Sequence, residues 1–232
     1  MSLPMPVTPK YETFLPVSKQ KVTFRPFLVK EEKILMIANE TNSIQQQTLA
    51  IKSVVNSCTF ETLNLNEISL ADIEHLFIMI RGKSIGEEIT AELECSACGK
   101  KVNYTIHLEK LKMEQDAIID KNIRIADDTV VTMRYPTINS SLDIDNNENV
   151  DIALKVTASC IVRITIGDDI HEAESFEPGE AKTYLENLTN KQLEKISEFM
   201  ESIPKIVYED NVKCVCGHEN FIYMEGMSSF FN

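Results

Sequence analysis

The stretch that decides the fold is Glu94-Cys95-Ser96-Ala97-Cys98-Gly99-Lys100, together with its distant counterpart Cys214-Val215-Cys216-Gly217-His218. Each is a short cysteine knuckle between two runs that are typical of β-strands. Two strand–knuckle–strand units that offer four thiolates are typical of a zinc ribbon, in which tetrahedral metal joins the tips of two hairpins. The sequence therefore predicts a structural Zn²⁺. Its expected ligands are Cys95, Cys98, Cys214 and Cys216, and the flanking strands are expected at Glu88–Glu94, Lys101–His107, Lys205–Tyr208 and Asn220–Met224.

Two details of the knuckles affect this interpretation. Gly99 and Gly217 follow the second cysteine of each knuckle, and glycine takes the positive φ that lets a chain reverse next to a metal. The second knuckle has one residue fewer between its cysteines than the first, so His218 is an alternative ligand in place of Cys214 or Cys216.

Other interpretations of the cysteines are a disulfide pair, a redox Cys-x-x-Cys motif and four unconnected thiols. A redox motif does not require the second knuckle, and a secreted disulfide protein is expected to carry an export signal, which Met1–Pro6 does not resemble. A catalytic zinc is disfavoured because four protein ligands leave no position open for water.

Length and composition bound the remaining possibilities. The chain has 232 residues, 43% of them hydrophobic, with only 7 Gly and 8 Pro, so it can bury a sizeable core and is neither fibrous nor disordered. No apolar run approaches the about 20 residues of a membrane span, and we expect no membrane partner. We expect the protein in a reducing cytoplasm, with Cys58 and Cys160 as small core residues.

The net charge of the chain argues against nucleic-acid binding, which is a common role of zinc ribbons. The chain has 36 acidic and 23 basic residues, a formal net charge of −13, so nucleic acid is repelled overall. We expect no nucleic-acid partner, although a zinc-ribbon nucleic-acid-binding protein or transcription factor remains an alternative hypothesis.

Hydrophobic periodicity predicts an α+β fold, because strand signals occur in pairs and helix signals in runs. An N-terminal hairpin is expected from Tyr11–Leu15 and Lys21–Arg25, and further strands at Thr129–Tyr135 and Cys160–Ile166. Helices are expected at Val29–Asn39, at Ile44–Asn56, from Leu70 until Gly82, at Val150–Ser159, from Pro178 through Leu188, and from a cap at Thr189 until Pro204.

The knuckles are separated by 115 intervening residues, which indicates that a mixed region is inserted between the two ribbon arms. Metal would then close a long loop and tie the halves of the chain together. The expected division is an N-terminal hairpin plus helices at 1–87, ribbon arms at 88–108 and 204–225, a mixed α/β insertion at 109–203, and a C-terminal tail at 226–232. The tail contains Phe230 and Phe231, which either fold back on the core or dock on a partner.

Signals for catalysis are missing from the sequence. It has no glycine-rich phosphate loop, no His-Glu-x-x-His helix and no nucleophile elbow, and His75, His107 and His171 stand alone. We therefore expect no enzyme and no small-molecule substrate. A metalloenzyme is kept as an alternative hypothesis, which would need an open coordination position.

Several segments, taken in order, resemble the baseplate hub subunits and hub assembly proteins of T4-like tailed bacteriophages. They are Phe24–Met36, Ser57–Phe60, Leu76–Glu88 with the Cys-x-x-Cys that follows, Met133–Pro136 and Glu225–Phe231. The resemblance implies a non-enzymatic structural or assembly component of the central hub of a contractile tail baseplate. It implies other baseplate hub proteins as partners, and a place in the virion tail or in the host cytoplasm during assembly. We expect Phe24–Lys33 and the Phe230-Phe231 tail to be the contact regions.

Overall fold

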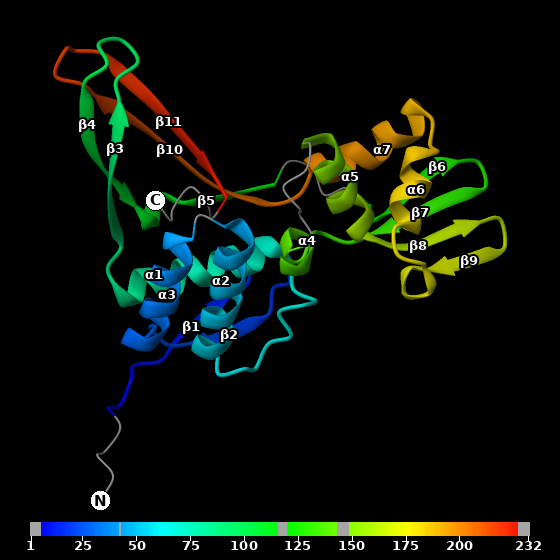
Figure 1. Ribbon diagram of the computed structural model, residues 1–232, viewed down its shortest axis with the longest axis horizontal. Helices are drawn as coiled ribbons and strands as arrows, with labels where there is room; N and C mark the ends of the chain where they lie inside the picture. Colours follow the sequence, from blue (N-terminus) through cyan, green and yellow to red (C-terminus); the bar gives the residue numbers. More distant parts are fainter. Residues whose placement is uncertain (1–5, 42, 116–119, 143–148, 227–232) are drawn as a thin grey trace, which may run out of the picture. The chain divides into compact units, whose positions relative to one another are not determined.

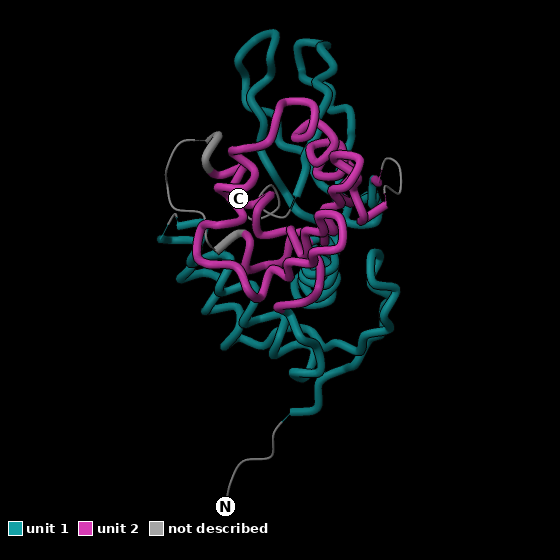
Figure 2. The backbone as a smooth tube through the Cα atoms, turned by 90° about the vertical axis from the view of Figure 1, so that its right-hand side faces the viewer, with its two compact units in different colours: residues 1–65, 71–114, 205–232 teal, residues 66–70, 115–204 magenta. Residues whose placement is uncertain are grey.

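A computed structural model describes residues 6–41, 43–115, 120–142 and 149–226 of the chain. They form a mixed structure of helices and small antiparallel sheets (Figure 1), which confirms the expected α+β class. The chain divides into two compact units (Figure 2). The first unit comprises residues 1–65, 71–114 and 205–232, and the second comprises residues 66–70 and 115–204.

The first unit begins with a hairpin and three helices. Strand β1 (Tyr11–Phe14) pairs antiparallel with β2 (Lys21–Phe24), and helices α1 (Val29–Glu40), α2 (Ile44–Cys58) and α3 (Leu70–Ser84) follow. Apolar residues at helical spacing are buried along α2 and α3, as expected for faces that pack against a core. On α1 the large apolar residues Ile34, Met36 and Ile37 are exposed. The fully or nearly fully buried side chains include Leu15, Phe24, Val54, Val55, Cys58, Ile73, Leu76, Phe77 and Ile80.

A buried ion pair holds the connection between β2 and α1. The Arg25 Nη2 lies 3.0 Å from the Glu31 Oε1, with the two side chains 10% and 3% exposed. Arg25 Nη1 also donates to the carbonyl of Pro26 at 2.9 Å, and Glu31 Oε2 accepts from the backbone N–H of Leu28 at 2.7 Å. Within the Phe24–Lys33 segment, Phe24, Arg25 and Glu31 are therefore buried inside the unit.

Two long hairpins complete the first unit. Strand β3 (Glu88–Glu94) pairs antiparallel with β4 (Lys101–His107), and β10 (Lys205–Lys213) pairs antiparallel with β11 (Glu219–Glu225). The short strand β5 (Lys112–Glu114) adds to the other edge of β10. The two hairpins lie side by side in both views (Figures 1 and 2).

The hairpins share a small core. Ile89, Ile106 and Tyr208 are buried together, with half-buried side chains of both hairpins packed against them. The hydroxyl of Tyr208 donates to Asp210 Oδ2 at 2.9 Å, and the ammonium of Lys110 lies 2.8 Å from the same oxygen. Burial, together with the neighbouring Asp210 carboxylate, raises the pKa of Tyr208 to about 12, so the phenol stays protonated at neutral pH.

The second unit is built on a four-stranded antiparallel sheet in the order β6-β7-β8-β9. The strands are β6 (Asn122–Ala126), β7 (Thr129–Met133), β8 (Ile161–Ile166) and β9 (Asp169–Glu172). Alternate residues are buried along β6, which is the pattern of a sheet with one face on a core.

Helices supply the other side of this core. They are α5 (Asn149–Ser159), α6 (Glu180–Glu186) and α7 (Asn190–Glu201). The short helix α4 (Ile138–Leu142) precedes them, and 3₁₀ turns lie at Ala173–Ser175 here and at Leu108–Lys110 in the first unit. Leu185, Ile196 and Phe199 pack against the sheet residues, and Cys160 is fully buried among them, as expected.

Helix α6 begins at Glu180 rather than at Pro178, because Gly179 takes a left-handed conformation with φ of 86° immediately before it. The tail residues Phe230 and Phe231, which are expected either to fold back on the core or to dock on a partner, lie outside the described residues. No helix in the described ranges has both the length and the apolar character needed to cross a membrane.

Candidate metal centre

The four knuckle cysteines meet at the tips of the two long hairpins. Their Sγ atoms all lie within 4.8 Å of one another, with Cys95 to Cys216 at 3.8 Å and Cys98 to Cys214 at 3.6 Å. A tetrahedral ion with metal–sulfur bonds of about 2.3 Å requires sulfur–sulfur distances of about 3.8 Å. The cluster therefore has the size that one tetrahedral metal ion needs.

The distances also bear on the other interpretations. A disulfide needs a sulfur–sulfur distance of about 2.05 Å, and all six cysteines of the chain are free. The Cys95–Cys216 and Cys98–Cys214 contacts each join one knuckle to the other, so the four thiols form one group rather than two separate pairs.

The knuckles turn as the glycines predict. The N–H of Gly99 donates to the carbonyl of Cys95 at 2.9 Å, and the N–H of Gly217 donates to the carbonyl of Cys214 at 2.9 Å. The two glycines have φ of 66° and 91°, values that side chains with a Cβ rarely adopt. Both turns bring the cysteine side chains to one side of the loop.

Asn220, which sequence reasoning missed, connects the two knuckles. Its amide Nδ2 donates to Cys95 Sγ at 3.6 Å, and its Oδ1 accepts from the backbone N–H of Ser96 at 3.1 Å. The side chain is nearly buried, at 7% exposure. A residue that orients a ligand in this way has no spacing signature, since only the folded hairpins bring it to the cluster.

His218 lies beside the cluster but outside the set of four ligand atoms. Its Nε2 is 3.0 Å from the hydroxyl of Ser96 on the opposite knuckle. The structure therefore places His218 in a hydrogen bond between the knuckles, while both Cys214 and Cys216 face the cluster.

The thiols of the cluster have strongly displaced pKa values. Burial raises the pKa of Cys95, but backbone N–H donors and the Asn220 amide more than offset this and bring it to about 6. At Cys98, the backbone N–H of Lys100 lowers the pKa, whereas the adjacent thiol of Cys216 and burial raise it to about 12. The thiol of Cys95 therefore ionises easily, whereas ionisation of the Cys98 thiol is disfavoured by the neighbouring thiols. A divalent cation at the centre would stabilise all four thiolates.

Other candidate residues lie apart from this centre. Cys58 and Cys160 are fully buried, and burial raises the pKa of each to about 11. His75 contacts the hydroxyl of Thr13 at 3.2 Å. In the described part of the chain, the four knuckle cysteines are the group of His, Cys, Asp and Glu side chains whose ligand atoms converge closely enough to share an ion.

Comparison with known proteins identifies the family of the chain. No curated protein and no solved structure matches it. One family model, described as T4 bacteriophage base plate protein, matches residues 8–232, which include both hairpins, both knuckles and the second unit. Because the match covers almost the entire sequence, the resemblance to T4-like baseplate proteins is confirmed, and the chain belongs to the T4 bacteriophage base plate protein family.

Proposed function

We propose that the chain is a structural or assembly component of the central hub of a contractile tail baseplate, and that it acts through contacts with other baseplate hub proteins. The observation that carries this proposal is the family match over residues 8–232. The family implies a place in the tail of the virion, and assembly takes place in the host cytoplasm.

The proposed part of the cysteine cluster is structural. Cys95, Cys98, Cys214 and Cys216 hold one Zn²⁺ in a zinc-ribbon-like arrangement, supported by the spacing of the sulfurs and their all-thiolate donor set. The ion supplies a cross-link between the β3–β4 and β10–β11 hairpins. Four protein ligands leave no position for a reacting water, which supports a non-enzymatic role.

The role in assembly is tested in phage whose gene for this chain carries a nonsense mutation, with the chain supplied from a plasmid. We expect cells without the chain to accumulate tail parts that lack a completed hub, and the parent chain to restore finished baseplates, both counted by electron microscopy. Mass spectrometry of purified virions then separates a retained subunit from an assembly factor that leaves.

Cross-linking of purified baseplates or assembly intermediates identifies the neighbours. Cross-links to hub proteins are the expected result. Normal hubs in cells that lack the chain, or cross-links to peripheral baseplate proteins alone, contradict the hub proposal.

The metal is tested with Cys95→Ser in the same complementation. Val215→Ser serves as the matched control, because Val215 lies in a knuckle but is 88% exposed and outside the cluster. We expect Cys95→Ser to reduce the yield of baseplates and Val215→Ser to leave it near the parent value.

A further inference from the structure

The net negative charge of the chain is concentrated in the second unit. Residues 66–70 and 115–204 contain 19 acidic and 8 basic side chains, a formal charge of −11. The first unit contains 17 acidic and 15 basic side chains, a formal charge of −2. One unit is therefore strongly acidic, whereas the other is close to neutral.

Seven of the 19 acidic side chains of the second unit lie in one segment, residues 167–186. Lys182 is the lone lysine or arginine in this stretch of sequence. The seven acidic residues there are Asp168, Asp169, Glu172, Glu174, Glu177, Glu180 and Glu186.

Two of these seven carboxylates have a cation close by. Glu172 lies 2.7 Å from Arg163, and Glu186 lies 3.5 Å from Lys182. The other five make no ion pair with any residue that the structure describes. Unpaired negative charge is thus left over on this segment.

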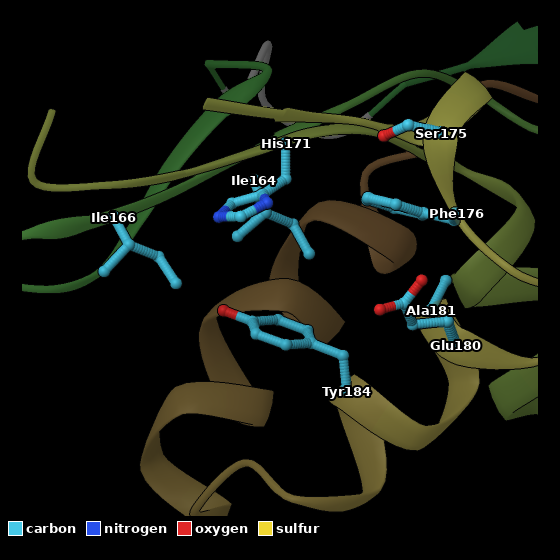
Figure 3. A pocket seen from close by; sticks show the side chains of 8 residues that line it. All are labelled: Ile164, Ile166, His171, Ser175, Phe176, Glu180, Ala181 and Tyr184. Carbon is cyan, nitrogen blue, oxygen red and sulfur yellow. The ribbon is translucent and has the colours of Figure 1, made fainter. Parts of the chain in front are cut away.

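The same segment, together with Ile164 and Ile166 of β8, lines a solvent-open cavity of about 240 Å³ (Figure 3). Figure 3 shows the rings of Phe176 and Tyr184 and the carboxylate of Glu180 directed into it, with Ile164 and His171 on the opposite wall. The volume is below the about 300–1,000 Å³ of typical small-molecule sites. One long side chain suits it better than a cofactor does.

The carboxylate of Glu180 is held in position at the start of α6. Its Oε2 accepts a hydrogen bond from the backbone N–H of Glu177 at 2.9 Å. Burial raises the pKa of Tyr184, so its phenol stays neutral and its ring is available for contact with a cation. An apolar wall, two aromatic rings and a fixed carboxylate converge on the same hollow.

We propose that this cavity receives an arginine side chain from a basic segment of a partner protein. The aliphatic part of that side chain packs on Ile164 and Ile166, and its guanidinium stacks on Tyr184 and pairs with Glu180. The unpaired carboxylates around the cavity attract further cations of the same segment. The inference rests on the proposed function in one respect, namely that the partner is another protein.

The charges exclude other occupants. Nucleic acid is repelled by a unit with a formal charge of −11. A second copy of this unit is repelled for the same reason. A metal ion is disfavoured because the carboxylates of this segment do not converge within ligand distance among the described residues.

Arginine fits better than lysine for a geometric reason. Its planar guanidinium can stack on a ring while two of its N–H groups meet a carboxylate, whereas an ammonium is a compact, strongly hydrated charge. Replacing arginine by citrulline keeps the shape and removes the charge, so the two contributions can be separated.

The test uses a library of random decapeptides displayed on yeast and selected on the immobilised full chain. We expect the selected peptides to contain an arginine with neighbouring lysine or arginine residues. Their binding, measured by fluorescence polarisation, should weaken by at least about tenfold on Glu180→Gln, on Tyr184→Ala, and on replacement of the peptide arginine by citrulline.

Glu180→Gln is the decisive variant, because glutamine can still accept the hydrogen bond from Glu177 and the fold is expected to survive. Glu186→Gln is its matched control on the same helix, paired with Lys182 and outside the cavity, and we expect it to change the affinity less than about threefold. Circular dichroism checks that each variant is folded.

Selection of no peptide, selection of peptides without arginine, or equal binding to the parent chain and Glu180→Gln overturns the inference. Each of these results leaves the baseplate role standing, because that role is judged by complementation and cross-linking. Conversely, failure of complementation contradicts the baseplate role while the peptide measurements still decide what the cavity binds.

Discussion

At the scale of single residues, Glu31 is expected to contribute to stability because it is the buried partner of Arg25. Removing one member of a buried ion pair leaves the other charge without compensation. We expect Glu31→Gln to lower the free energy of unfolding by about 3 kcal/mol. Urea denaturation followed by circular dichroism measures this, and Glu32→Gln, next along the chain but exposed, should change the value by less than about 0.5 kcal/mol.

The same pair predicts a dependence on pH. Burial raises the pKa of Glu31, but the hydrogen bond and charge of Arg25 and the N–H of Leu28 outweigh it, so the pKa falls below its ordinary value of 4.5. A lowered folded-state pKa means that the stabilisation is fully present above pH 4.5 and is lost as the pH falls through the folded-state value. The stability difference between the parent and Glu31→Gln should therefore shrink below pH 4.5; a difference that stays constant down to pH 2 would contradict the pairing.

Sequence patterns did not reveal this pair. Arg25 and Glu31 lie on either side of Pro26, at a spacing that belongs to neither a helix nor a strand, and pairing becomes visible only when α1 folds back on the hairpin. Cys58 and Cys160 were easier to place, since their apolar neighbours predicted burial, and both are fully buried.

At the scale of elements, the next prediction concerns the tips of the two long hairpins. Asn220 is the second residue of β11 and orients Cys95 of the other hairpin. We expect Asn220→Ala to weaken zinc binding by about tenfold or more, measured by competition with a chromogenic chelator. Asn211→Ala, an exposed asparagine on β10, is the control and should bind zinc like the parent.

A separate measurement determines whether zinc is the bound ion. Elemental analysis should find one zinc for each chain in protein purified without chelators. Protein that is folded and contains no zinc would rule out the proposed site, whatever the affinity of Asn220→Ala.

Elements with strong periodicity or caps were predictable. The strands β3 and β4 have the expected bounds, and the capping residues Thr189 and Gln192 mark the start of α7. Short elements were not predictable: β5 has three residues and is defined by its pairing with β10, and β9 is polar and exposed along most of its length. Their positions depend on tertiary contacts, which outweigh local propensity.

For the whole molecule, the prediction concerns nucleic acid. With a formal charge of −13, we expect no measurable binding to duplex DNA at about 0.15 M salt, where screening leaves only local patches effective. Fluorescence anisotropy with a labelled duplex measures this. Micromolar affinity that falls steeply with salt would show that a basic surface outweighs the net charge.

The total charge was readable from composition, but its division between the units was not. That division depends on where the chain leaves the first unit and returns to it, near residues 114 and 205. The cavity in the second unit could not be predicted from the sequence either. Its walls come from β8, β9, the Ala173–Ser175 turn and α6, each contributing one to three residues.

The long separation of the two knuckles also has a consequence for the order of events during synthesis. Cys98 and Cys214 are 116 residues apart, and a ribosome adding about 5–20 residues per second needs roughly 6–23 s to cover that distance. During this time the first knuckle has left the ribosome as an incomplete pair of thiols, while the entire second unit is being made. The four cysteines can therefore come together only after the whole second unit has been synthesised and has had time to fold.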